Sequence, residues 1–213
     1  MKIAPKSKLV MIGDSITDCG RSRPVGEGLF DALGKGYVSL VHGRLSAAYP
    51  GHLIRVANLG TGGDTVVNLQ GRWQTDVLDL KPDWLSVMIG INDVWRQFDC
   101  PQLPELHVGL EQYEATLDEL LGATRPQLKG LVLMTPFFIE SNRQDAMRAR
   151  MDQYGAVVKK LAAKHDAILV DTQAAFDQVL EHLYSGTLAW DRVHPSVTGH
   201  VILAEAFLQA IEF

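Results

Sequence analysis

The sequence predicts an α/β fold, a three-layer α/β/α sandwich with a mostly parallel central sheet. Two observations support this prediction. Short, continuously apolar runs recur along the chain, and longer segments with apolar residues at helical spacing lie between and after them. Strands that alternate with helices form right-handed crossovers, which place helices on both faces of a parallel sheet.

Five apolar runs are predicted to be the strands of this sheet. Each run is rich in Val, Ile and Leu and lacks the polar alternation of a strand with one face in water. The runs are residues 9–13, 53–57, 84–90, 131–134 and 167–170. Since ligand sites in open α/β sheets form at the carboxyl ends of the strands, we expect functional residues directly after these runs.

Three segments show the apolar spacing of helices that pack on the sheet. They cover residues 113–121, 151–161 and 201–211. Ser196 precedes the last segment and is a candidate N-cap for it. Residues 26–36 are glycine-rich and are predicted to be irregular. The charged residues of 143–150 are predicted to form a solvated helix face.

Composition limits the classes of function. A length of 213 residues fits a single domain, 1–213, with one sizeable core. The net charge of -5 predicts a surface that repels phosphate backbones, so nucleic acid is not an expected partner. Cys19 and Cys100 are too few for a disulfide framework or a thiolate metal site. The apolar run 9–13 is too short for a secretory signal or a membrane span, so we expect a cytoplasmic protein without a membrane partner.

A serine directly follows the first predicted strand, in the sequence Gly13-Asp14-Ser15. A serine held at such a junction can act as a nucleophile and point its backbone N–H toward an anion. The alternative is a helix N-cap, for which Asp and Ser are both preferred. Thr17 occupies the place of the final glycine in the G-x-S-x-G elbow of the α/β-hydrolases, so that motif is not matched. This segment alone favours neither interpretation.

An aspartate lies three residues before a histidine late in the chain, as Asp191 and His194. On one turn, the carboxylate can hold imidazole Nδ1 and leave Nε2 free to take a proton from a serine. The alternative is a surface aspartate beside a half-buried histidine at the start of a helix. The position after the last predicted strand favours a triad with Ser15, and Ser, Asp, His is a known chain order for such triads.

Two further segments after predicted strands are candidates for stabilising an oxyanion. A glycine within residues 58–65 lets the backbone approach a substrate and donate an N–H, although a plain turn is the alternative. In residues 90–93, the side-chain amide of Asn92 could donate in the same way, and an Asx-turn is its alternative.

Taken together, the four segments resemble the SGNH, or GDSL, hydrolases, a family named for a Ser, a Gly, an Asn and a His in separate blocks. The resemblance implies the flavodoxin-like fold of that family, with Ser15 as nucleophile and first oxyanion donor. It implies Gly63 as the second donor, because the family's glycine lies five residues after the asparagine of its block, here Asn58. Asn92 is implied as the third donor.

By the same resemblance, His194 is the base and Asp191 orients it. Residues 12–21, 88–97 and 189–196 are similar to segments of the intracellular acetylxylan esterases of this family. This similarity spans nearly the whole chain. It implies a serine carboxylic-ester hydrolase that removes O-acetyl groups from xylo-oligosaccharides through an acetyl-serine intermediate. It also implies a homo-oligomer that needs no cofactor.

Three residues are candidates for substrate contact. Trp190 lies beside Asp191 and Trp95 lies soon after Asn92, so either indole could lean over the site and stack on a sugar ring. Core packing is the alternative for both, and it is the stronger alternative for Trp95. Arg21 is the third candidate by the same argument.

The sequence lacks the motifs of the common metal and cofactor sites. There is no H-E-x-x-H, and no serine or threonine follows the lysine of residues 34–36, as a P-loop requires. Two other functions stay open. One is a short-chain lipase, thioesterase or lysophospholipase with the same mechanism, although no apolar, lid-like insertion offers room for a long acyl chain. The other is a non-catalytic sugar-binding protein on this fold, against which the intact set of catalytic residues argues.

Overall fold

A five-stranded parallel sheet is the middle layer of the structure, a computed structural model that describes residues 1–213. The strand order is β2-β1-β3-β4-β5, and every neighbouring pair is parallel. The strands are β1 (Lys8–Gly13), β2 (Arg55–Gly60), β3 (Trp84–Met88), β4 (Gly130–Met134) and β5 (Ile168–Val170). The order changes direction between β1 and β3, and ligands of such sheets bind at this switch point.

The register places the ends of three strands at one edge. Gly13 of β1 pairs with Gly60 of β2 and with Met88 of β3. A side chain on Gly13 could not fit there, because its Cβ would lie 2.3 Å from the carbonyl oxygen of Met88. The chain therefore leaves β1, β2 and β3 side by side, and the segments predicted to carry function follow these three ends.

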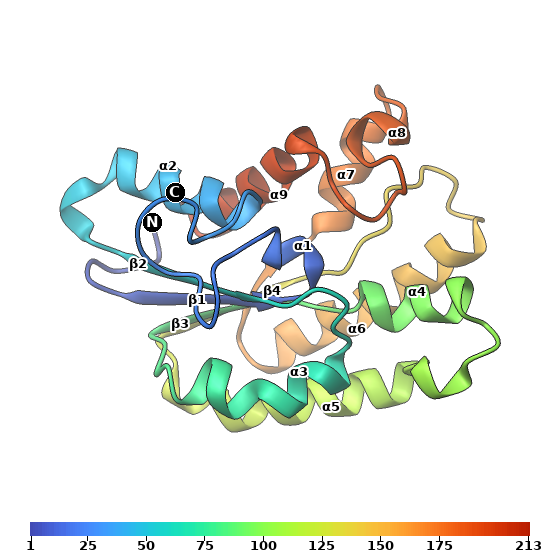
Figure 1. Cartoon of the computed structure of the whole chain (residues 1–213), viewed down its shortest axis with the longest axis horizontal. Helices are drawn as coiled ribbons and strands as arrows, with labels where there is room; N and C mark the ends of the chain where they lie inside the picture. The colour runs from blue at the N-terminus through green and yellow to red at the C-terminus, as the bar shows by residue number, and fades with distance from the viewer.

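Helices cover both faces of the sheet (Figure 1), which confirms the predicted sandwich. The helices are α1 (Ser15–Asp18), α2 (Tyr37–Ala48), α3 (Val66–Trp73), α4 (Ile91–Asp99), α5 (Leu110–Thr124), α6 (Ala146–Lys164), α7 (Thr172–Leu180), α8 (Ser185–Leu188) and α9 (Val197–Ala210). Helices α2, α7 and α9 lie on one face, while α3, α5 and α6 lie on the other. None of these helices combines the length and the apolar composition that a bilayer span requires.

Three of these helices were predicted from their spacing, and the others were not. The segments around 113–121, 151–161 and 201–211 are parts of α5, α6 and α9. Helix α4 carries apolar residues at helical spacing, Ile91, Val94, Trp95 and Phe98, but its first turn also buries Asn92 and Asp93. The sequence analysis interpreted this polar pair only as residues that follow a strand, so the helix was not predicted.

Two strands differ from their predicted bounds by more than one residue. Strand β2 starts at Arg55, because Leu53 has a left-handed backbone with φ of 49° and cannot belong to a strand. Strand β3 ends at Met88, before the predicted end at residue 90. Gly90 has φ of 132°, which favours glycine, and it is the N-cap residue of α4.

The predicted solvated face of residues 143–150 is wrong at one position. The side chain of Arg148 is only 2% exposed. Its guanidinium donates to Asp177 at 2.8 and 2.7 Å and to Asp152 at 2.9 Å, so the buried charge is compensated. A repeat of charged residues along one helix cannot reveal a partner on another helix, here α7.

Candidate active site

Three side chains from opposite ends of the chain form a hydrogen-bonded series. Ser15 Oγ lies 3.0 Å from His194 Nε2, and His194 Nδ1 lies 2.7 Å from Asp191 Oδ2. Because a carboxylate only accepts hydrogen bonds, Nδ1 carries the proton and Nε2 presents its lone pair to the serine hydroxyl. This is the arrangement that a serine nucleophile and its base require.

Asp191 is held by its own turn. Its Oδ1 accepts the backbone N–H groups of Val193 at 3.0 Å and His194 at 2.8 Å, while Oδ2 accepts His194 Nδ1. Partial burial raises the pKa of Asp191, but the hydrogen bonds from His194 and the two backbone groups outweigh it, so the pKa is lowered. The carboxylate is therefore charged and fixed toward the imidazole.

Ser15 owes its position to the residue before it. Asp14 is the N-cap of α1 and accepts the backbone N–H of Ile16 at 3.0 Å. Ser15 is the first residue of that helix, so its own N–H precedes the first hydrogen bond within the helix and has no acceptor there. The cap therefore leaves both the hydroxyl and the N–H of Ser15 for the site.

The loop after β2 lies beside Ser15. A Cβ on Gly62 would be 3.9 Å from the Cβ of Ser15, and Gly63 next to it has φ of 83°, a left-handed backbone typical of glycine. On the other side of this loop, Asn92 Nδ2 donates to the carbonyl oxygen of Asp64 at 3.0 Å. The loop thus connects the nucleophile with the amide of Asn92.

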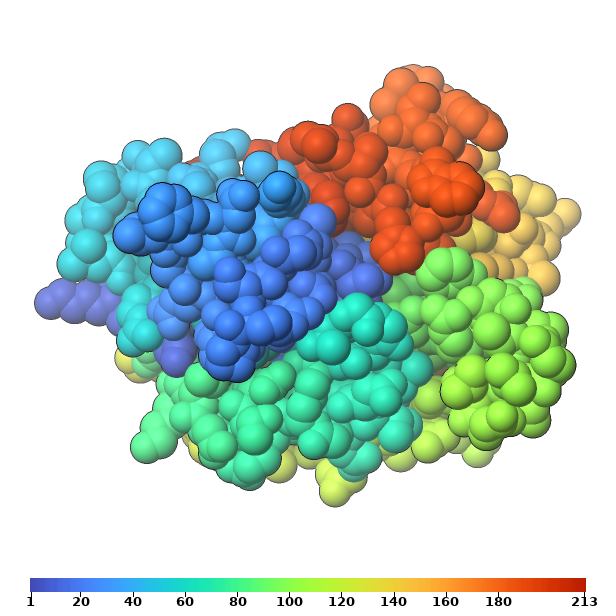
Figure 2. All heavy atoms as spheres, in the orientation of Figure 1, coloured from blue at the N-terminus to red at the C-terminus, as the bar shows by residue number.

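Figure 2 shows the same convergence at the surface. Atoms of the N-terminal part (blue), of the segments coloured teal and green, and of the C-terminal part (orange-red) meet on the face shown. The structure therefore brings Ser15, Gly63, Asn92, Asp191 and His194 to one edge of the sheet. These five residues form the candidate site, and they are the catalytic and oxyanion residues that the sequence analysis named.

Comparison with known proteins agrees with this geometry. The GDSL-like Lipase/Acylhydrolase family matches residues 11–202. The chain belongs to this family. An acetylxylan esterase of Geobacillus stearothermophilus is 61% identical over 213 residues, which are 100% of this chain and 97% of the relative. The resemblance predicted from the sequence is therefore confirmed, and the chain is a serine esterase of the GDSL family.

Solved structures extend the comparison. The crystal structure of the Geobacillus stearothermophilus esterase has a TM-score of 0.99 at 60% identity, and the match covers 100% of this chain and 97% of the other. An α/β hydrolase from the metagenome of Lake Arreo in Spain has a TM-score of 0.98 at 54% identity, covering 100% and 98%. Structures of the Geobacillus stearothermophilus esterase with alanine in place of its own Ser15, Asp191 or His194 are those of catalytic mutants.

In this GDSL hydrolase, an arginine that the sequence analysis missed joins the strand ends. Arg72 of α3 donates to the carbonyl oxygens of Gly13 at 2.9 Å and Leu59 at 2.7 Å, and it forms an ion pair with Asp64 at 2.6 Å. It therefore fixes the ends of β1 and β2 and the loop that holds Gly63. No local pattern could have revealed it, because each partner lies in a different segment.

Asp18 is a second supporting residue that the sequence analysis did not single out. Its carboxylate accepts the backbone N–H groups of Gly62 at 3.2 Å and Arg21 at 3.2 Å, and it pairs with the guanidinium of Arg23 at 2.5 Å. Partial burial raises the pKa of Asp18, but the contacts with Arg23 and the backbone outweigh it and lower the pKa. A charged residue in the first turn after the nucleophile is the signal that could have found it.

Two buried carboxyl groups lie under the site. Burial raises the pKa of Asp14 to about 7 and the pKa of Asp93 to about 7. Asp93 Oδ1 accepts the backbone N–H of Val66 at 3.0 Å, whereas its Oδ2 has no hydrogen-bond partner. Asp93 therefore links the start of α3 to α4, immediately after Asn92.

The two tryptophans differ in their surroundings. The ring of Trp95 lies 5.7 Å from the ring of His194 at an angle of 64°, an edge-to-face contact. Trp190 is 87% exposed. Trp95, for which core packing was the stronger alternative, is thus the indole that contacts the triad, while Trp190 offers a free aromatic face beside Asp191.

Arg21 does not lie as the sequence analysis expected. Its guanidinium donates to the carbonyl oxygens of Gly60 at 2.6 Å, Ser22 at 3.0 Å and Pro24 at 2.7 Å. The residue is only 7% exposed, and burial lowers the pKa of its guanidinium to about 10. These donors face carbonyl oxygens of the loop after α1 and of the end of β2 instead of the side chains of the site, so Arg21 connects that loop to the end of β2.

Cys19 lies close to a histidine but is not activated by it. Its Sγ is 3.5 Å from His200 Nε2, and His200 Nδ1 accepts the backbone N–H of Tyr37 at 3.2 Å. Burial lowers the pKa of His200 to about 4, so the ring is neutral and carries its proton on Nε2. His200 donates to the thiol of Cys19 and cannot act as its base.

No group of three or more His, Cys, Asp or Glu side chains is placed to hold a metal ion.

Proposed function

We propose that this esterase removes O-acetyl groups from carbohydrates, with acetylated xylo-oligosaccharides as its substrates, through an acetyl-serine intermediate. The contact between Ser15 Oγ and His194 Nε2 at 3.0 Å, beside the candidate oxyanion donors, is the observation that carries the mechanism. The relative with 61% identity, an acetylxylan esterase, supports the substrate. A mutant structure of the same relative is that of an acetyl-xylooligosaccharide esterase.

Acylation follows from the positions of these groups. Ser15 Oγ attacks the acetyl carbonyl carbon while His194 Nε2 takes the hydroxyl proton. The carbonyl oxygen becomes an oxyanion, which accepts hydrogen bonds from the N–H groups of Ser15 and Gly63 and from Asn92 Nδ2. The imidazolium then gives its proton to the sugar oxygen as the C–O bond breaks, which leaves acetyl-serine.

Deacylation repeats the steps with water. His194 takes a proton from the water that attacks the acetyl carbonyl, and the second oxyanion forms among the same donors. Collapse of this intermediate releases acetate and returns the proton to Ser15. Asp191 keeps the ring in place and stabilises the imidazolium without accepting the proton itself. Every step uses groups of the chain, the substrate and water.

Trp190 is the proposed contact for the sugar. Its exposed indole lies next to Asp191, and aromatic faces suit the apolar faces of sugar rings. Trp95 is packed edge-to-face on His194, so we propose that it limits the position of the imidazole and of any sugar that comes close to it.

Acetate release from acetylated xylo-oligosaccharides, measured beside acetylated glucose and acetylated chitin fragments, tests the substrate. We expect the highest kcat/KM with the xylo-oligosaccharides and no release with the Ser15→Ala variant. The preference for a short acyl chain is tested by comparing the hydrolysis of p-nitrophenyl acetate with that of p-nitrophenyl octanoate. Faster hydrolysis of the octanoate would instead support a lipase or thioesterase, and unchanged hydrolysis by Ser15→Ala would contradict the proposed site.

A cytoplasmic location, expected from the short apolar run 9–13, and a homo-oligomeric assembly, implied by the resemblance to the intracellular acetylxylan esterases, stay predictions. Fractionation of the source cells tests the location. Light scattering during size-exclusion chromatography tests the assembly.

A further inference from the structure

The amide of Asn92 is held from both of its ends. Its Nδ2 donates to the carbonyl oxygen of Asp64 at 3.0 Å, and its Oδ1 accepts from Nη2 of Arg96 at 3.4 Å. The residue is 2% exposed, so water does not compete freely for these groups. Since Nδ2 carries two hydrogens and Asp64 takes one, the other is left for an acceptor in the site.

These two contacts decide which end of the amide faces the substrate. Turning the amide by half a rotation would place Oδ1 against the carbonyl oxygen of Asp64 and the NH₂ group against the guanidinium of Arg96. Two acceptors and two donors would then face each other, and both hydrogen bonds would be lost in a buried place. Only the observed orientation points an N–H into the site.

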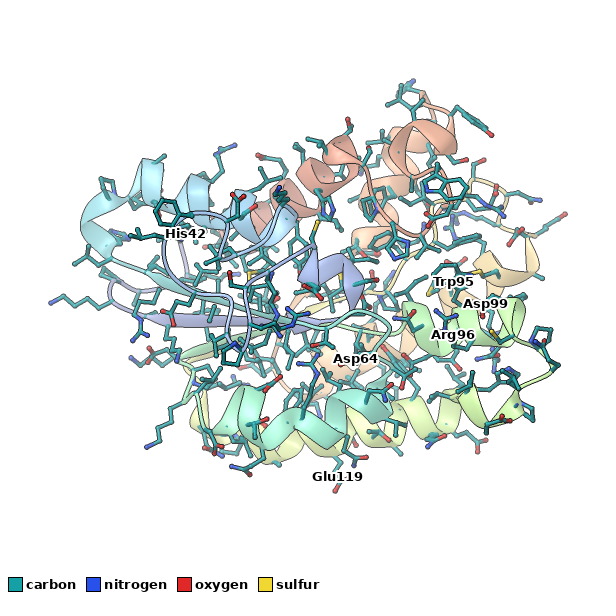
Figure 3. The ribbon with its side chains drawn as sticks, in the orientation of Figure 1. His42, Asp64, Trp95, Arg96, Asp99 and Glu119 are labelled. Atoms are coloured by element: carbon teal, nitrogen blue, oxygen red, sulfur yellow. The ribbon has the colours of Figure 1, made fainter.

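Arg96 is itself fixed on α4. It forms an ion pair with Asp99, one turn further along the helix, and its guanidinium lies over the ring of Trp95 with 5.0 Å to the ring centroid. Figure 3 shows Trp95, Arg96 and Asp99 gathered at this helix, with Asp64 on the neighbouring loop. Trp95 also contacts the ring of His194, so Arg96 touches Asn92 directly and is linked to the base only through Trp95.

We propose that Arg96 is a positioning residue of the oxyanion hole. It fixes the orientation of the Asn92 amide, and its positive charge at Oδ1 draws electrons toward that oxygen, which makes the N–H of Nδ2 a stronger donor. This inference rests on the proposed function, in which Asn92 donates to the oxyanion. Arg96 acts through Asn92 and does not touch the reacting atoms.

A double-mutant cycle tests the inference, with p-nitrophenyl acetate as substrate for Arg96→Met, Asn92→Ala and the double variant. We expect Arg96→Met to lower kcat by about 10- to 100-fold and to change KM by less than about twofold, because the lost contact matters most in the transition state. In the Asn92→Ala background, the same substitution should change kcat by less than about twofold. Multiplicative losses would contradict the inference, since Arg96 would then act independently of Asn92.

Arg150→Met is a matched control. Arg150 lies over the ring of Tyr154 at 5.5 Å and donates to the amide oxygen of Gln97 at 3.2 Å. Both substitutions therefore remove one cation–π contact and a hydrogen bond to an amide oxygen on α4, but only the amide of Asn92 belongs to the site. Each also removes one further contact, from Arg96 to Asp99 and from Arg150 to the amide oxygen of Gln153 at 2.7 Å. We expect similar losses of Tm and a reduced kcat for Arg96→Met alone. Equal kcat values for the two variants would contradict a specific role.

Two further variants keep the test decisive if Arg96→Met does not fold. Arg96→Lys retains the charge and is expected to keep more of kcat than Arg96→Gln, which retains only the capacity to donate. If Arg96→Lys and Arg96→Gln were both as active as the wild type, the inference would be refuted.

The kinetics also separate the inference about Arg96 from the proposed function. Full activity of Asn92→Ala contradicts the proposed site, whereas a slow Asn92→Ala beside a fully active Arg96→Met contradicts only the role of Arg96.

Discussion

The nucleophile side and the base side of the site are built in different ways. Around Ser15, the buried polar residues Asp14, Asn92 and Asp93 follow the ends of β1 and β3, and all are at most 2% exposed. Each of them bonds a backbone group, and for Asn92 and Asp93 that group lies in the segment after β2. On the other side, the side chain of His194 is 46% exposed, and Asp191 holds it within one turn. The base side is therefore encoded in four consecutive residues, whereas the nucleophile side depends on how distant segments pack.

This difference predicts how substitutions will behave. On the base side, side chains near the surface contribute to catalysis but little to folding. On the nucleophile side, the same residues that support the oxyanion also satisfy buried polar groups, so activity and stability should fall together. The predictions that follow test this contrast, from the largest expected effect to the smallest.

His194→Ala gives the largest effect on catalysis. We expect kcat for p-nitrophenyl acetate to fall by about 10⁵- to 10⁶-fold, because the base that takes the serine proton is removed. The exposed ring contributes little to folding, so we expect Tm to change by less than about 2 °C. Steady-state kinetics and thermal unfolding measure the two effects. A large loss of Tm would show that the base side is also part of the scaffold.

Asn92→Ala should affect both properties. Loss of one oxyanion donor lowers kcat by about 100- to 1000-fold. The carbonyl oxygen of Asp64 also loses its donor in a buried place, which should lower the free energy of unfolding by about 1–3 kcal/mol. Kinetics and urea unfolding test this pair of effects. A variant that loses activity but no stability would remove the contrast between the two sides.

Asp93→Asn should change how stability depends on pH. Burial raises the pKa of Asp93 from its ordinary value of 3.8 to about 7. Between these values the folded chain keeps a proton that the unfolded chain has lost, so the free energy of unfolding falls as pH rises from about 4 to 7. The substitution removes this contribution, about 1.4 kcal/mol for each unit of pKa shift. The fall with pH should therefore become shallower.

Urea unfolding between pH 4 and 8 measures this effect. Asp31→Asn is the control, because Asp31 is an exposed carboxylate whose side chain is 79% exposed. It should leave the pH dependence as it is in the wild type. The idea fails if Asp93→Asn loses stability with rising pH as steeply as the wild type does.

Two helix starts give the smallest expected effects. Thr65 accepts the backbone N–H of Asn68 in a capping box at the start of α3, on the nucleophile side. Ser196 is the N-cap residue of α9, on the base side, but its hydroxyl donates to the carbonyl oxygen of Thr187 at 3.2 Å and makes no capping hydrogen bond. We expect Thr65→Ala to cost about 1 kcal/mol of unfolding free energy and Ser196→Ala less than about 0.5 kcal/mol. Equal costs, measured by urea unfolding, would contradict this order.

The sequence predicted the fold class because buried parallel strands leave an unmistakable apolar pattern. It also placed the candidate triad, since Asp191 and His194 form one local turn and Ser15 follows a strand. Both interpretations of Gly13-Asp14-Ser15 hold, for different residues: Asp14 is the cap, and Ser15 is free to face the histidine.

The rest could not be predicted because it depends on contacts across the fold. Arg72 and Arg96 have no local signature, and their importance comes from the carbonyl and amide oxygens that packing brings to them. The orientation of Arg21 could not be predicted for the same reason, because its nearness in sequence to Ser15 does not show where its guanidinium points. Only the resemblance to the SGNH hydrolases identified Gly63 as the second oxyanion donor, because more than one glycine lies in the loop after β2.

The distance between Ser15 and His194 along the chain also bears on biosynthesis. The two residues are separated by 179 positions. At a synthesis rate of about 5–20 residues per second, the histidine is added roughly 9 to 36 seconds after the serine. A nascent or prematurely terminated chain therefore contains the nucleophile without its base. Esterase activity therefore requires that nearly the whole chain has been synthesised and that folding has brought Ser15 and His194 into contact.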